Sequence, residues 1–167
     1  MTSASFTFFS TERGSTFECA LDGSGFTGCA SPRSYANLPD GEHVFRVRAT
    51  DAAGNTDGSP ARRVWTVDTV KPTVKPVSPK PGAKVRDRTP AIKATVRDNH
   101  ANLRKWNIRL FVAGKEIPRR NFKYNRKTDR LVHSSRKLAP GKKNVRIVAV
   151  DRAGNKKVRP WHFKVAR

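Results

Sequence analysis

The sequence contains no long hydrophobic run and no recognisable catalytic motif. No window approaches about 18 consecutive apolar residues, so we expect no segment that inserts into a membrane. The patterns of a serine nucleophile elbow, a glycine-rich phosphate loop and a zinc-binding His-Glu-x-x-His helix do not occur. The histidines are scattered without the spacing of metal ligands; they are His43, His100, His133 and His162. We therefore expect no enzyme, no cofactor and no metal site.

Helical periodicity is also missing. No long stretch repeats with a period of 3.6 residues, and glycine and proline number 11 each. Apolar and basic residues alternate instead, for example across residues 45–49, and turn signals separate such stretches at short intervals. Many short strands of this kind predict an all-β sandwich.

Cysteine is rare, with Cys19 and Cys29 as the only two. Nine residues separate them, and "LDGSG" between them is a turn signal. A disulfide that closes a short hairpin, with the two cysteines at facing strand positions, fits this spacing and would indicate an oxidising compartment. The alternative is a pair of reduced, half-buried thiols. Two cysteines without a nearby histidine pair cannot complete a zinc site.

Lysine is absent from residues 1–70, although the whole chain has a net charge of +22. Residues 1–70 contain six arginines and eight acidic residues, a net charge of −2. Residues 71–167 contain 29 basic and five acidic residues, a net charge of +24. This break indicates two domains with different surfaces.

One phrase occurs twice, 100 residues apart. Residues 38–55, "LPDGEHVFRVRATDAAGN", align without a gap with residues 138–155, "LAPGKKNVRIVAVDRAGN". Each copy reads as a strand that follows a glycine turn and ends in Asp-x-Ala-Gly-Asn. We interpret this ending as a structural turn, because Asp accepts backbone hydrogen bonds there while Gly and Asn tolerate a positive φ. Its residues are Asp51, Gly54 and Asn55 in one copy and Asp151, Gly154 and Asn155 in the other. The alternative is a calcium loop, which would need six to eight oxygen ligands.

Prolines mark the boundary between the two repeats, with four of them within residues 67–82. We expect domains at residues 1–68 and 73–167, joined by a linker at 69–72, and an edge strand over 72–77. Strands are expected over residues 4–10, 15–23, 61–68, 90–98, 105–114 and 160–167, with a hairpin over 121–135. Trp106 is expected to point inward with the other apolar residues of its strand. The expected core includes Phe45, Val47, Trp65, Ile108, Leu110, Ile147 and Phe163.

Residues 6–68 closely resemble the immunoglobulin-like and fibronectin-III-like repeats of bacterial surface and secreted proteins of the actinobacterial type. The resemblance is carried by "FECALDG", "LPDGEHVFRVRATDAAGN" and the closing "WTVD". Residues from "KPTVKPVSPKPGAKV" to "LAPGKKNVRIVAVDRAGN" resemble a second, more general repeat of the same class. The resemblance implies two tandem immunoglobulin-like β-sandwiches, used as stalks, spacers or adhesive segments outside the cell, with further repeats of a longer parent chain as neighbours.

Such repeats normally have a strand before the one at "FTFFS", and here Met1 stands just before it. We therefore expect the first repeat to lack its N-terminal strand. "MTSASFTFF" does not read as a secretory signal, so the chain is expected to be the C-terminal piece of a longer exported protein, or a reading frame whose start is placed too late.

The basic domain provides the one positive indication of a ligand. If its strands pack as in a sandwich, cations and an aromatic ring share one outer face; they are Arg109, Phe111, Arg146, His162 and Lys164. This face could hold acidic cell-wall polymers or acidic polysaccharide. We expect any binding to reside in residues 71–167 and nucleic acid to bind only non-specifically, since no nucleic-acid-binding motif occurs. The alternatives are a plain spacer, whose basic face serves only solubility, and a nucleic-acid-binding domain.

Overall fold

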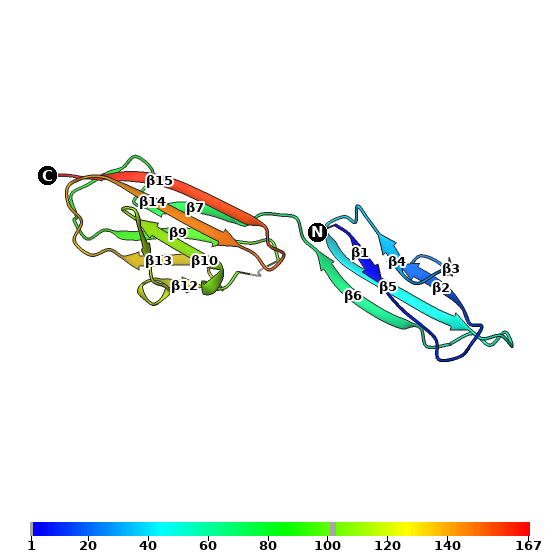
Figure 1. Ribbon diagram of the computed structural model, residues 1–167. Helices are drawn as coiled ribbons and strands as arrows, with labels where there is room; N and C mark the ends of the chain where they lie inside the picture. The colour runs from blue at the N-terminus through cyan, green and yellow to red at the C-terminus, as the bar shows by residue number, and fades with distance from the viewer. Residues whose placement is uncertain (1, 101–102) are drawn as a thin grey trace. The chain divides into compact units, whose positions relative to one another are not determined.

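The computed structural model describes residues 2–100 and 103–167, which form an all-β fold (Figure 1). The only helical elements among these residues are two three-residue 3₁₀ turns, η1 (Lys105–Asn107) and η2 (Arg119–Asn121). No helix in this part of the chain is long and apolar enough to cross a membrane. The chain divides into two compact units, residues 1–69 (unit 1) and 70–167 (unit 2), and residues 69–72 span the division.

Unit 1 contains a four-stranded and a two-stranded sheet. The larger sheet has the order β3-β2-β5-β6, and the smaller pairs β1 with β4. The strands are β1 (Ala4–Phe6), β2 (Thr16–Leu21), β3 (Thr27–Cys29), β4 (Arg33–Tyr35), β5 (Gly41–Thr50) and β6 (Ala61–Val67). The strand expected over residues 4–10 is thus shorter, and in the described part of the chain it pairs with β4 alone.

An aromatic cluster joins the two sheets of unit 1. Phe6 stacks on Phe45 with ring centroids 4.3 Å apart, and Tyr35 meets Phe45 edge-on at 6.0 Å. Phe45 and Val47 are buried as expected, because alternate residues of β5 point inward. Trp65 is only half-buried, which corrects its placement in the core. It lies on the edge strand β6, where its ring packs against Phe6 and His43.

The hairpin β2–β3 contains the expected disulfide between Cys19 and Cys29, with Cα atoms 5.8 Å apart. The expectation that the two cysteines face each other was wrong. Cys19 pairs with Thr27 and Cys29 pairs with Phe17, so the bridge is diagonal across the hairpin. It ties the edge strand β3 to the centre of the sheet.

Unit 2 is a sandwich of a five-stranded sheet, β11-β10-β14-β15-β8, and a four-stranded sheet, β12-β13-β9-β7. Its strands are β7 (Thr73–Ser78), β8 (Lys84–Val85), β9 (Ala91–Arg97), β10 (Ile108–Val112), β11 (Lys115–Ile117), β12 (Lys123–Asn125), β13 (Arg130–Ser134), β14 (Gly141–Val150) and β15 (Lys156–Val165). β7 is an edge strand, where its proline is tolerated. This architecture confirms the immunoglobulin-like β-sandwich fold class.

The core of unit 2 is formed by inward residues of both sheets. Ile108, Leu110, Ile147 and Phe163 are fully buried, as the alternation of their strands predicts. Trp161 joins them at 6% exposure, and its indole N–H donates to the carbonyl of Pro79 at 3.2 Å. Alternation in turn places the residues between these on the outer face of the five-stranded sheet.

Trp106 does not point inward, which corrects the expectation for residues 105–114. It is 59% exposed, because residues 105–107 form the turn η1 before β10 begins at Ile108. The side-chain oxygen of Asn107 accepts a hydrogen bond from the backbone N–H of Arg104 at 3.0 Å and closes this turn. A local side-chain bond therefore removes Trp106 from the strand pattern.

The repeated phrase forms the same turn in both units, directly after β5 and β14. In the first, the two carboxylate oxygens of Asp51 accept hydrogen bonds from the backbone and side-chain nitrogens of Asn55, both at 2.8 Å. In the second, Asp151 accepts from Asn155 in the same way at 2.8 and 2.9 Å. Gly54 and Gly154 have φ of +91° and +92°. These bonds give both carboxylates the same place in the turn, and the choice between a structural turn and a calcium loop stays a prediction.

Candidate polyanion-binding face

The outer face of the five-stranded sheet of unit 2 is built by three neighbouring strands. Phe111 on β10 lies directly opposite Arg146 on β14, which in turn lies opposite Pro160 on β15. Arg109 lies two residues before Phe111 on β10, and His162 lies two residues after Pro160 on β15. Both are on the same face, because side chains alternate with a period of two. The structure thus brings together four of the five residues selected from the sequence.

Phe111 lies between two arginines. The guanidinium carbon of Arg146 lies 4.0 Å from the centroid of its ring, and that of Arg109 lies 5.1 Å away. Both distances are within the reach of a cation–π interaction. A guanidinium that lies over a ring keeps the N–H groups in its own plane available to an anion.

Arg109 is less available than Arg146. It forms a two-pronged ion pair with Glu116 on β11, with N–O distances of 2.9 and 2.6 Å. The hydrogen bond from Arg109 lowers the pKa of the Glu116 carboxyl, and the same bond raises the pKa of Arg109. Arg146, by contrast, forms no ion pair with the other described residues. Arg109 is thus the arginine held in a hydrogen-bonded ion pair, whereas the charge of Arg146 acts on Glu116 only through space, where it helps to lower the pKa of that carboxyl.

A shallow hollow of about 460 Å³ opens beside this stack. Phe111, Arg146, Pro160 and His162 line it, together with Asn144. The lining thus combines a flat apolar ring, a cation, an amide and an imidazole. Such a set can hold a sugar ring and an acidic group on it.

Lys164 lies further along β15, away from Phe111. It pairs with Lys142 on β14 and with Lys84 on β8, so three lysines form a row across the sheet. Arg86 and Arg167 line the same hollow as Lys84 and Lys164. This row extends the positive charge of the face but contains no aromatic ring.

Glu116, the acidic residue of this face, was not among the residues predicted from the sequence. The signal was the turn Ala113–Gly114 between Val112 and Lys115, which returns the chain antiparallel to β10 and places Glu116 opposite Phe111. Both turn residues have a positive φ, of 50° and 81°, as a two-residue hairpin turn requires. Pro160 and Asn144 were missed because their roles depend on the register of β14 and β15.

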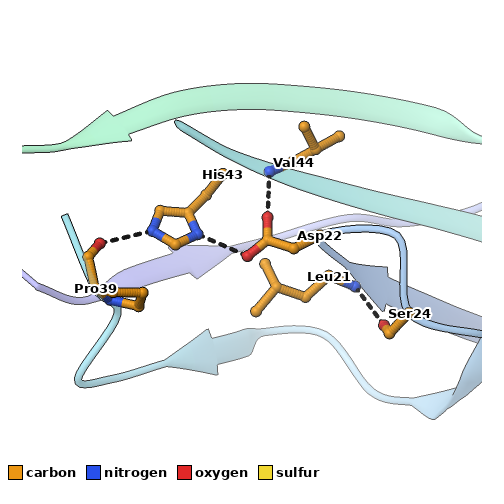
Figure 2. A network of polar contacts seen from close by, with 6 residues as sticks. All are labelled: Leu21, Asp22, Ser24, Pro39, His43 and Val44. Atoms are coloured by element: carbon orange, nitrogen blue, oxygen red, sulfur yellow. Dashed lines mark hydrogen bonds and ion pairs between the residues drawn. The ribbon is translucent and has the colours of Figure 1, made fainter. Parts of the chain in front are cut away.

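A histidine–aspartate pair in unit 1 serves structure rather than chemistry (Figure 2). His43 is buried, and its Nδ1 lies 2.7 Å from the carboxylate of Asp22 while its Nε2 lies 2.9 Å from the carbonyl oxygen of Pro39. The second carboxylate oxygen of Asp22 accepts a hydrogen bond from the backbone N–H of Val44. Because both ring nitrogens face acceptors, neither can take a proton from a nucleophile.

No family model and no curated protein matches this chain. Among solved structures, it is similar to the fibronectin(III)-like modules of CbhA from Clostridium thermocellum, with 18% identity, coverage of 98% of this chain and 84% of that one, and a TM-score of 0.47. An amphioxus IgVJ-C2 molecule shows 14% identity, coverage of 99% and 97%, and a TM-score of 0.42. Latent PorU from Porphyromonas gingivalis shows 15% identity, coverage of 92% and 20%, and a TM-score of 0.49. The actinobacterial type of the repeats stays a prediction.

Proposed function

We propose that this chain is a non-catalytic, extracellular immunoglobulin-like module whose unit 2 binds acidic cell-envelope polymers. The observation that carries the proposal is the stack of Arg146 on Phe111 beside a hollow in the outer face of unit 2. The stack lies in a part of the chain with a net charge of +24, which attracts a polyanion from a distance. Charge supplies the attraction, and the ring of Phe111 supplies a surface for a sugar.

The neighbours of the chain are proposed to be further repeats of the same class. Adhesion through repeated modules of weak affinity is compatible with a shallow hollow and a charged face. The disulfide supports an oxidising location outside the cytoplasm.

Salt titration of the full chain tests the proposal, with polygalacturonate, poly(glycerol phosphate) and duplex DNA as probes. Affinity for the two envelope-type polymers should fall steeply as salt rises, because released counterions drive the binding. Phe111→Ala should weaken this binding about fivefold even at high salt, the equivalent of about 1 kcal/mol. Arg146→Gln should weaken the binding most at low salt and so reduce its salt dependence.

Arg130→Gln provides the matched control, since it removes an exposed arginine from β13 in the other sheet of the same unit. It should change the affinity less than Arg146→Gln does. If all three probes bind with equal affinity and Phe111→Ala leaves that affinity unchanged, the chain is a plain spacer with a basic surface. Clearly tighter binding of DNA would favour the nucleic-acid alternative.

A further inference from the structure

The outer face of the four-stranded sheet of unit 1 also carries an aromatic ring between two arginines. The guanidinium carbons of Arg48 and Arg46 lie 4.3 and 5.7 Å from the ring centroid of Phe26, which stands just before β3. Arg62 on β6 is the register partner of Arg46 and shares its face. Three cations and one ring therefore gather on this sheet. We call Phe26, Arg46, Arg48 and Arg62 the unit 1 platform.

Only part of the charge of the unit 1 platform is used within the fold. Arg48 is bound by Glu18 on β2, with both its Nε and its Nη2 2.8 Å from the same carboxylate oxygen. Arg46 forms no ion pair within the described part of the chain, and its inaccessible Nε has no hydrogen-bond partner there. The available cations are thus Arg46 and Arg62.

The unit 1 platform corresponds to the stack in unit 2. Arg46 and Arg146 are the sixth residues of the aligned strands β5 and β14. In each unit this arginine lies over a phenyl ring, and in each unit the second arginine at the ring is bound by a glutamate. In both places one arginine is held in a hydrogen-bonded ion pair and the other is not.

The two rings nevertheless come from different parts of the fold. Phe111 stands directly opposite Arg146 in the sheet, whereas the position opposite Arg46 is Ala20. Phe26 reaches the arginines from the connection between β2 and β3. Duplication of a common ancestral repeat does not explain the two rings, because Phe26 and Phe111 stand at positions that do not correspond. A shared requirement for a ring at this arginine does.

We propose that the unit 1 platform is a second binding site for an anionic glycopolymer, so that each unit carries one site. The ligand class rests on the proposed function of unit 2. Arg46 and Arg62 would hold the carboxylate or phosphate of the polymer, and Phe26 would contact its sugar or glycerol carbons. This departs from the expectation from the sequence, which assigned all binding to residues 71–167 and none to residues 1–70. The net charge of −2 averages over all of residues 1–70, whereas four of their six arginines are concentrated on β5 and β6.

Titration calorimetry of the full chain with short oligomers at low salt tests this inference. The probes are tri-galacturonate, which carries carboxylates, and a glycerol phosphate trimer, which carries phosphates. We expect two sites per chain for whichever probe binds, one site in Arg46→Gln, one in Arg146→Gln and none in the double variant. Arg13→Gln removes an exposed arginine of unit 1 from a loop and should keep both sites.

The outcomes separate this inference from the proposed function. If Arg146→Gln loses a site and Arg46→Gln keeps the wild-type stoichiometry, unit 1 has no site while the function of unit 2 stands. If the wild-type chain binds neither oligomer, both fail. A lower melting temperature of Arg46→Gln with unchanged stoichiometry would assign the platform a purely structural role. A shift of the Arg46 Nε–H resonance on titration of the wild type, without a shift of the Arg13 Nε–H resonance, would support binding at Arg46.

Discussion

His43 shows how one buried side chain makes stability depend on pH. Its two ring nitrogens face the carboxylate of Asp22 and the carbonyl of Pro39, which only accept hydrogen bonds. The hydrogen bond to Pro39 and that to Asp22 raise the pKa of His43 against the opposing effect of burial. Burial opposes the shift of Asp22 as well, but the bonds from His43 and Val44 lower the pKa of its carboxyl. Both shifts favour the charged form of the pair.

The sign of the effect follows from these directions. Since the pKa of His43 is raised on folding, its contribution to stability is complete below the unfolded value of about 6.5 and is lost as the pH rises through the folded value. The contribution of Asp22 is lost at the other end, as the pH falls through its lowered pKa. We expect the melting temperature of unit 1 to fall between mildly acidic and alkaline pH, and His43→Gln to flatten this dependence. An NMR titration in which His43 has an ordinary pKa would contradict the prediction.

The hairpin β2–β3 depends on its disulfide more than on its ladder. β3 has three residues at the edge of the sheet and pairs with β2 alone, so few contacts hold it without Cys29. In the chain-entropy model, a loop of this length loses about 2–3 kcal/mol of stability on reduction. We expect the free energy of unfolding of unit 1, measured by urea titration, to fall by this amount in a reductant.

Unit 2 provides the internal control for this measurement, because it contains no cysteine. Its unfolding should be unchanged by the reductant. An equal shift in both units would show that the reductant acts by some other route, and no shift in unit 1 would show that β3 is held by packing.

The strands with the clearest alternation were the ones that the sequence predicted well. β5 and β14 have the expected inward residues because an apolar residue at every second position specifies one register. The prediction for Trp106 was wrong because the side-chain oxygen of Asn107 accepts a hydrogen bond from the backbone N–H of Arg104. This bond closes a turn, so the strand begins only at Ile108. Cys29 was placed directly opposite its partner because spacing alone does not give the register of a short hairpin.

The candidate face was predicted in part for the same reason. Arg109, Phe111, Arg146 and His162 share a face because alternation fixes it within each strand. Glu116, which neutralises Arg109, depends on a strand of three residues that has no periodicity of its own. The ring of Phe26 lies outside any strand, so no pattern in the sequence could place it over Arg46 and Arg48.

The two units differ in how much side chain they bury, which predicts different stabilities. Among the largest fully buried side chains of the described residues, Val67 alone belongs to unit 1. The core of unit 2 joins residues from both of its sheets, whereas unit 1 relies on half-buried aromatic rings around Phe45. Because burial of apolar surface is the main stabilising contribution to folding, unit 1 should unfold first.

Hydrogen exchange of the aligned strands β5 and β14 measures this difference within one molecule. The amides of Val47 and Ala49 have the same strand positions as those of Ile147 and Ala149, and all four belong to central strands. Exchange from such strands reports the global unfolding of each unit. We expect the β5 amides to exchange faster, and faster still in a reductant, while the β14 amides are unaffected by it. Exchange from β5 as slow as that from β14 would mean that the aromatic cluster and the disulfide together compensate for the smaller core.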